Sequence, residues 1–180
     1  MRIVISGAPG TGKTSIINKL ENKGYIVFPE ISREIILKYK NLGQDQLFLI
    51  DPIKFSKILL TKRISQFNMS NSLNSKNIFF DRGIPDILAY LNYKKISCEK
   101  DFKQASMKFK YDYIFIADPW KDIYKNDKQR YESFEESKII SKYIKKTYSE
   151  NGYDYIKLPF SSVEDRINFI IKNISWTIIK

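Results

Sequence analysis

The stretch Gly7-Ala8-Pro9-Gly10-Thr11-Gly12-Lys13-Thr14 decides the fold of this chain. It follows a short β-branched run at 2–6 (RIVIS), and it precedes the segment 14–23, whose apolar residues lie on one side of a predicted helix. The pattern Gly-x-x-x-x-Gly-Lys-Thr between a strand and a helix is that of a Walker A phosphate-binding loop. Its glycines let successive backbone N–H groups point at phosphate oxygens, and the helix adds its positive N-terminal end.

A loop of this type binds a nucleoside triphosphate together with Mg²⁺. We expect Lys13 to reach the β- and γ-phosphates and the Thr14 hydroxyl to ligate Mg²⁺. The predicted nucleotide-binding residues are Gly7, Ala8, Pro9, Gly10, Thr11, Gly12, Lys13, Thr14 and Ser15. No Asn/Thr-Lys-x-Asp motif for guanine is present, since Asn126-Asp127-Lys128 has the wrong order and place. The sequence therefore favours ATP, with GTP as the alternative.

The composition limits the chemistry that the chain can perform. Its 180 residues, 43% hydrophobic and 28% charged, predict one globular domain over 1–180. There is one cysteine and no histidine, which excludes an intrachain disulfide, a Cys/His zinc site and a Ser-His-Asp mechanism. Phosphoryl transfer, which depends mostly on positioning and electrostatics, needs none of these groups.

Apolar runs and helical stripes alternate along the chain, which is typical of an α/β fold with a parallel sheet. The predicted strands are 2–6, 25–28, 78–80, 113–117 and 153–158. The predicted helices cover 14–23, 32–40, a segment from Asp51-Pro52 to about 67, 85–93, 132–149, and a last helix with a capping box at Ser161 and Glu164. In a doubly wound sheet the ligand binds beyond the carboxyl ends of the strands, so the residues directly after each strand are the candidates for the site.

Polar side chains follow two of these strands. Asp81 ends an apolar strand as a Walker B carboxylate does, and it is a candidate to hold Mg²⁺ or to orient an acceptor; the alternative is a helix cap or a partner for Arg82. Arg82 is a candidate clamp for a phosphate or hydroxyl, or else a surface ion pair. After the second strand, Glu30 is a candidate base or ligand for an acceptor hydroxyl, and Arg33 a candidate for a second anionic group. The alternative there is a first-turn glutamate that favours the helix dipole, with a solvated arginine.

A polar stretch at about 120–132 follows the fourth predicted strand and is a candidate lid. Its cations are Lys121, Lys125, Lys128 and Arg130, of which Arg130 is the candidate to reach the transferring group. The alternative is a solvated run of charges. Trp120 is a packing anchor or a stacking platform, and packing is favoured.

Several segments together resemble the small "AAA family ATPase" proteins that have a NadR-like P-loop kinase domain. They are ISGAPGTGKT at 5–14, FPEISREI at 28–35, FFDRGIPDILAYL at 79–91, ADPWKDIYKNDKQRYESFEES at 117–137 and YDYIKLPFSSVEDRINFI at 153–170. The resemblance covers nearly the whole chain, and the segments after the Walker A loop are the more specific part of it.

The resemblance implies a three-layer fold like that of nucleoside monophosphate kinases, with helices on both faces of a five-stranded parallel sheet of order 2-3-1-4-5. It also implies nucleotide and Mg²⁺ binding and a small-molecule acceptor. The Asp81-Arg82 pair is similar to the pair that serves Mg²⁺ and the acceptor in deoxynucleoside and thymidylate kinases, and Glu30 is placed like their acidic residue at the acceptor. The chain has no room for the helical lid domain of a mechanical AAA+ machine.

The leading interpretation is a phosphotransferase in which Lys13, Asp81, Glu30, Arg82 and Arg130 are the candidate catalytic residues and Glu30, Arg33 and Arg82 contact a nucleoside- or nucleotide-like acceptor. A nucleotide-dependent switch that binds anionic lipid or a protein partner is the alternative. The net charge of +11 alone suggests a nucleic-acid-modifying kinase, which is disfavoured because no nucleic-acid motif is present. With neither a signal peptide nor an apolar run of about 20 residues, we expect a cytoplasmic protein, with peripheral contact to anionic lipid left open.

Overall fold

The structure, a computed structural model, describes residues 1–41, 47–97, 100–124 and 132–175. The strands are β1 Arg2–Gly7, β2 Ile26–Phe28, β3 Ile78–Asp81, β4 Tyr113–Ala117 and β5 Ile156–Lys157. The helices are α1 Lys13–Asn22, α2 Ser32–Asn41, α3 Leu47–Ile50, α4 Pro52–Met69, α5 Pro85–Tyr93, α6 Lys100–Lys108, α7 Phe134–Glu150 and α8 Val163–Ser175, with a 3₁₀ turn, η1, at Lys121–Ile123. None of the described helices combines the length and apolar character needed to cross a bilayer.

The five strands form one parallel sheet in the order β2-β3-β1-β4-β5. This is the predicted strand order, and it places β1 at the centre with Ile3 opposite Phe79 on one side and Tyr113 on the other. Because all strands run the same way, the segments that follow β1, β2, β3 and β4 meet at one edge of the sheet.

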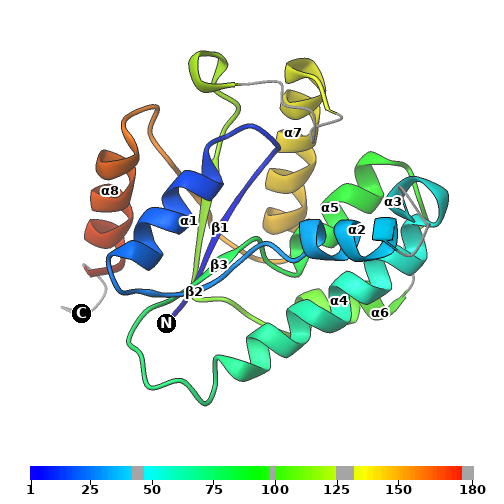
Figure 1. Cartoon of the computed structure of the whole chain (residues 1–180), viewed down its shortest axis with the longest axis horizontal. Coiled ribbons are helices and arrows are strands. Elements are labelled where there is room, and N and C mark those ends of the chain that lie inside the picture. The colour runs from blue at the N-terminus through cyan, green and yellow to red at the C-terminus, as the bar shows by residue number, and fades with distance from the viewer. Residues whose placement is uncertain (42–46, 98–99, 125–131, 176–180) are drawn as a thin grey trace.

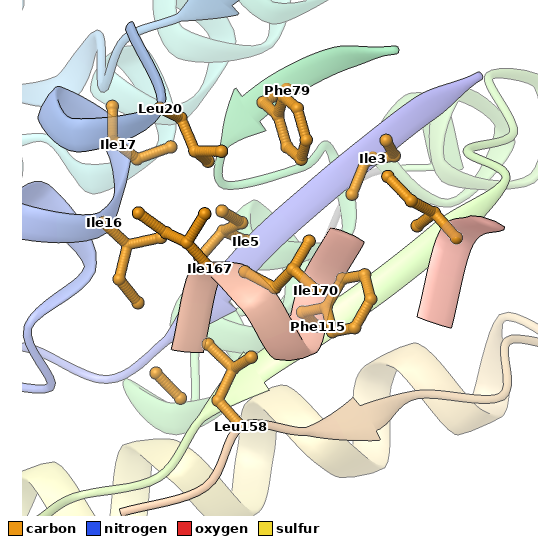
Figure 2. Packing of buried hydrophobic residues seen from close by; sticks show 12 residues of the cluster. Ile3, Ile5, Ile16, Ile17, Leu20, Phe79, Phe115, Leu158, Ile167 and Ile170 are labelled. Atoms are coloured by element: carbon orange, nitrogen blue, oxygen red, sulfur yellow. The ribbon is translucent and has the colours of Figure 1, made fainter. Parts of the chain in front are cut away.

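Helices cover both faces of the sheet, as the three-layer prediction requires (Figure 1). Helices α1 and α8 pack on one face, where Figure 2 shows Leu20 and Ile170 against Phe79, Ile5 and Phe115. Neighbouring strand residues point to opposite faces, so the other face is built from a different set of side chains. There the helices α4, α5 and α7 pack on the sheet through Val4, Phe67, Phe80, Ala89, Ile116, Ile140 and Ile144.

A third apolar cluster lies away from the sheet and holds α2, α4, α5 and α6 together. Its buried members include Ile35, Leu59, Leu88 and Phe102. This cluster fixes the helices that follow β2 and β3, so it sets one wall of the site described below.

Most element boundaries lie within two residues of the predictions, and the larger differences fall near the C-terminus. The strand predicted at 153–158 is limited to Ile156–Lys157, and the helix predicted from 132 begins at Phe134, where Ser133 and Glu136 form a reciprocal capping box. The capping box predicted at Ser161 and Glu164 is wrong, because the Ser162 hydroxyl instead accepts from the backbone N–H of Asp165. The short elements α3, α6 and η1 were not predicted, whereas Asp51 caps α4 as expected.

The first glycine of the phosphate-binding loop is required by close contact with the neighbouring strand. Gly7 has φ 145°, and a Cβ atom there would lie 2.3 Å from the carbonyl oxygen of Ala117 on β4. Backbone atoms on a central strand have little room to move, so a side chain at this position would push β1 and β4 apart.

We expect Gly7→Ala to lower the free energy of unfolding by more than about 3 kcal/mol, because it combines backbone strain with a backbone clash. Gly24→Ala is the matched control: Gly24 also has a positive φ of 85°, but nothing lies within 4 Å of its Cβ position. Strain alone predicts a loss of about 1–2 kcal/mol there. Urea unfolding of both variants checks this, and equal losses would contradict the clash.

Candidate functional site

The backbone of the loop 7–14 is held from outside by three side chains that come from three different parts of the chain. They donate to alternate carbonyl oxygens: Arg82 Nη1 to Gly7 O at 2.9 Å, Ser137 Oγ to Pro9 O at 2.8 Å, and Arg166 Nη1 to Thr11 O at 3.0 Å. Carbonyls that are engaged on the outer side leave the intervening N–H groups free to face a bound anion. The loop is therefore braced in the form that a phosphate needs.

Lys13 is buried in this loop at the start of α1. Its Nζ donates to the carbonyl of Ala8 at 2.7 Å and to Thr11 Oγ1 at 3.2 Å. Burial, together with the nearby charge of Arg82, lowers the pKa of Lys13 to about 7, although the surrounding carboxylates oppose this. A phosphate oxygen is a charged acceptor, so it would draw this ammonium forward and stabilise its protonated form.

Asp81 ends β3 next to the loop and is only 6% exposed. Burial and the charge of Glu30 raise its pKa to about 6, against the attraction of Lys13 and Arg82. Its Oδ1 has no hydrogen-bond partner in the described part of the chain. A buried carboxylate oxygen without a partner is costly, and a hydrated cation would satisfy it.

Asp81 and Thr14 fit a Mg²⁺ ion of the kind that nucleotide enzymes use. Thr14 is exposed at the first turn of α1, so its hydroxyl is accessible. Within the described ranges, no three acidic or Cys/His side chains gather as a metal cage. Mg²⁺ takes one or two protein oxygens and fills its octahedron with phosphate oxygens and water, so Asp81 and Thr14 would be enough protein donors for it.

Glu30, which follows β2, and Arg82, which follows β3, form an ion pair in which Arg82 is buried and Glu30 is partly buried. Glu30 Oε1 lies 2.8 Å from Arg82 Nε, accepts from Ser32 Oγ at 2.5 Å, and lies 4.0 Å from Arg63 Nη2. Burial disfavours the charge of Glu30, but Arg82 and Lys13 outweigh that cost and lower its pKa to about 2. Glu30 is thus a carboxylate held ionised at any physiological pH.

A cavity of about 320 Å³ opens beside the loop and Glu30. Its wall contains the charged side chains of Lys13, Glu30, Arg33 and Arg82. The remaining wall is largely apolar and comes from the third cluster and the segment before it: Ile36, Phe48, Phe55, Leu59, Ile87 and Leu91. Tyr90, Asp86, Glu132 and Glu136 are also part of the lining. The cavity is shaped for a small molecule with a polar reacting end and a flat or apolar body.

The structure brings most of the predicted residues together. Glu30, Arg33 and Arg82 line one cavity with the predicted loop, and Asp81 lies beside Lys13 and Glu30. Arg33 is exposed on the first turn of α2. Arg130 lies outside the described residues, as do 125–131 of the predicted lid; the described part of that stretch contains η1 and Glu132.

Trp120 packs, as favoured from the sequence. Its ring stacks on Phe160 at 5.5 Å and lies 5.1 Å below the guanidinium of Arg166. Because Arg166 also donates to the loop, the segment after β4 is tied to the phosphate-binding loop through this arginine.

Two arginines of the site were missed in the sequence. Arg63 on α4 is 3% exposed and donates to the carbonyl of Gly83 at 2.5 Å, and Arg166 on α8 is also 3% exposed. Both sit within apolar stripes of helical spacing, with Leu59 and Phe67 around Arg63 and with Ile167 and Ile170 around Arg166. A charged residue at a core-facing helical position is the signal that would have found them.

Comparison with known proteins agrees with this geometry. A family model described as "AAA domain" matches residues 2–166. The chain belongs to this AAA domain family. No curated protein matches the chain in a sequence comparison.

Solved structures resemble this AAA domain chain over almost its full length. A deoxyadenosine kinase from M. mycoides with bound dATP is 20% identical with a TM-score of 0.66, covering 97% of this chain and 100% of that one. The same kinase with bound dCTP is 21% identical with a TM-score of 0.63, covering 97% and 99%. A thymidylate kinase from Ehrlichia chaffeensis is 18% identical with a TM-score of 0.68, covering 97% and 98%. At these identities the likeness shows a common fold, that of P-loop nucleoside and nucleotide kinases.

The raised pKa of Asp81 predicts a pH-dependent stability. A carboxyl whose pKa rises from 3.8 to about 6 on folding stabilises the fold below pH 4, and this contribution is lost as the pH rises through 6. We therefore expect Asp81→Asn to raise the free energy of unfolding by roughly 2–3 kcal/mol at pH 7.5 and by about 1 kcal/mol at pH 4.5. Denaturant unfolding at both pH values checks this.

Asp154→Asn is the control, because Asp154 is exposed away from the site. Its effect on stability should be within about 0.5 kcal/mol at both pH values. A loss of stability in Asp81→Asn at pH 7.5 would show that Asp81 is structurally satisfied.

Proposed function

We propose that this chain is a Mg²⁺- and ATP-dependent phosphotransferase that transfers the γ-phosphoryl group to a hydroxyl of a nucleoside-like small molecule. The observation that carries the proposal is Glu30, an ionised carboxylate whose side chain is 18% exposed in the wall of a cavity that Lys13 of the phosphate-binding loop also lines. A nucleotide switch needs no such carboxylate facing the cavity beside its phosphate-binding loop.

The hydroxyl acceptor follows from how the cations of the site are used. The polar contacts of Arg82 and Arg63 are to Glu30, to Asp86 and to backbone carbonyls. Neither guanidinium is therefore arranged to receive an acceptor phosphate. Glu30 itself favours a neutral hydroxyl, which donates to a carboxylate, and repels a phosphate monoester.

In the transfer, the acceptor hydroxyl donates to Glu30, and its oxygen forms a bond to the γ-phosphorus. The bond from that phosphorus to the β–γ bridging oxygen breaks, ADP leaves, and Glu30 takes the hydroxyl proton. A carboxylate with a pKa of about 2 is a weak base, so its main task is to orient the hydroxyl and accept the proton late. Lys13 and the loop amides stabilise charge on the phosphate oxygens.

Asp81 and Thr14 would hold Mg²⁺, which when bound neutralises the β- and γ-phosphate oxygens. The apolar wall of the cavity suits the base of a nucleoside, and the known structures of this fold include a deoxyadenosine kinase. ATP is favoured over GTP because the guanine motif is missing from the sequence.

The test begins with binding. Thermal shifts with Mg²⁺ and a non-hydrolysable ATP analogue come first, followed by a nucleoside series on the loaded protein. A nucleoside that raises ATP turnover many-fold supports the transferase; hydrolysis that no acceptor stimulates would identify an NTPase instead. Lys13→Ala is expected to abolish turnover.

Glu30→Gln tests the role of the carboxylate directly. With the stimulating acceptor, we expect kcat to fall by about 100-fold or more while the KM for ATP changes less than about threefold. Glu34→Gln is the matched control, since Glu34 is one turn along α2 and its side chain is 65% exposed in an ion pair with Lys62. Steady-state kinetics of both variants test this prediction. Normal turnover in Glu30→Gln would show that Glu30 has no part in the mechanism.

A further inference from the structure

Asp86, on the first turn of α5, is the most enclosed carboxylate near the site. It lies in the segment Asp-Arg-Gly-x-Pro-Asp, but the proposed chemistry does not use it. Its side chain is 1% exposed. Four donors converge on it: Ser6 Oγ at 2.6 Å and Arg82 Nη1 at 3.3 Å reach Oδ1, while Tyr148 OH at 2.6 Å and the Gly83 backbone N–H at 2.9 Å reach Oδ2.

These contacts leave Asp86 no free oxygen to offer a ligand, although it lies in the cavity wall. Three of the four donors are neutral, and Arg82 is the charged one. An ionised carboxylate in the interior needs a positive partner, so Asp86 and Arg82 hold each other. The fit is close, because a Cβ atom on Gly83 would lie 2.7 Å from the hydroxyl of Tyr148.

Arg82 in turn contacts both the phosphate-binding loop and Glu30. Its Nη1 is shared between Asp86 and the carbonyl of Gly7, and its Nε faces Glu30 at 2.8 Å. The guanidinium is planar and rigid, so fixing one nitrogen fixes the direction of the others. The backbone of Arg82 has φ 73°, a left-handed conformation that a side chain with several anchors can stabilise.

We propose that Asp86 is a positioning residue that locks the Arg82 guanidinium as a bridge between the phosphate-binding loop and Glu30. Without that lock, Arg82 keeps its charge but loses the direction that lets it brace Gly7 and orient the acceptor carboxylate together. This inference rests on the proposed function for its consequence in turnover, but the lock itself does not depend on the acceptor.

The experiment compares Asp86→Asn with Tyr148→Phe. Asp86→Asn keeps the size of the side chain and removes the charge that faces Arg82. Tyr148→Phe removes one hydrogen bond from the other oxygen and leaves the contact with Arg82 in place. Both substitutions remove a buried interaction, so both are expected to lower the melting temperature.

Only Asp86→Asn should change the site. We expect it to weaken binding of Mg²⁺ with a non-hydrolysable ATP analogue at least fivefold by calorimetry. We also expect the Nε–H proton of Arg82 to exchange with water faster than in the wild type, as measured by NMR. Its resonance is assigned by its loss in Arg82→Lys. In Tyr148→Phe, the affinity for the ATP analogue and the exchange rate of the Arg82 Nε–H proton should both stay within twofold of the wild-type values. A purely structural role predicts parallel losses of stability in the two variants with unchanged affinity and resonance, and that result would overturn the proposal.

Should Asp86→Asn fail to fold, Asp86→Glu keeps the charge but displaces it by one methylene. The same two readouts then apply, and wild-type affinity with a wild-type Arg82 resonance would overturn the proposal. The resonance reports on the lock even if the chain binds no nucleotide, so failure of the proposed function and failure of this inference are distinguishable.

Discussion

The site depends on one guanidinium. Arg82 leaves the end of β3 in a left-handed conformation and turns its side chain back under the phosphate-binding loop, where it meets Gly7, Glu30 and Asp86. Burial alone would lower the pKa of Arg82, but the negative charges of Glu30 and Asp86 beside it outweigh that cost and raise its pKa well above the usual value. The parallel sheet makes this meeting possible, because β1 and β3 are neighbours and β2 lies next to β3, so the segments that follow them end at the same edge.

The architecture could be predicted from the sequence because its signals are local and repeated. The Walker A loop places a strand before Gly7 and a helix after Lys13, and the alternation of apolar runs with helical stripes requires a parallel sheet. The strand order came from the resemblance to P-loop kinases, since spacing alone does not order parallel strands. Errors fell where the signal was weak: β5 contains two residues, and adjacent serines at 161 and 162 both offered a cap for α8.

The site residues that lie at or just after strand ends could be predicted from the sequence, and the reason is the topology of the sheet. Residues at strand ends, such as Glu30 and Asp81, are visible in the sequence because topology alone brings them together. Arg63, Ser137 and Arg166 lie within helices, and their contacts with the site depend on how those helices pack. A hydrogen bond between Arg166 and Thr11 spans 155 positions in the chain, and no local pattern encodes such a pairing.

The charged groups of the site differ in how well the fold compensates their burial, and this difference bears on the proposed function. Glu30 is satisfied: it is ionised, paired with Arg82 and bonded to Ser32, so it contributes stability at neutral pH. Asp81 and Lys13 are strained: burial raises the pKa of one to about 6 and lowers the pKa of the other to about 7, and one oxygen of Asp81 has no partner in the described chain. A metal ion and a phosphate chain would relieve both at once, so binding free energy is stored in groups that the fold leaves under-compensated. In the proposed function, the Glu30–Arg82 pair would orient the acceptor, while Asp81 and Lys13 would favour binding of the metal and the triphosphate.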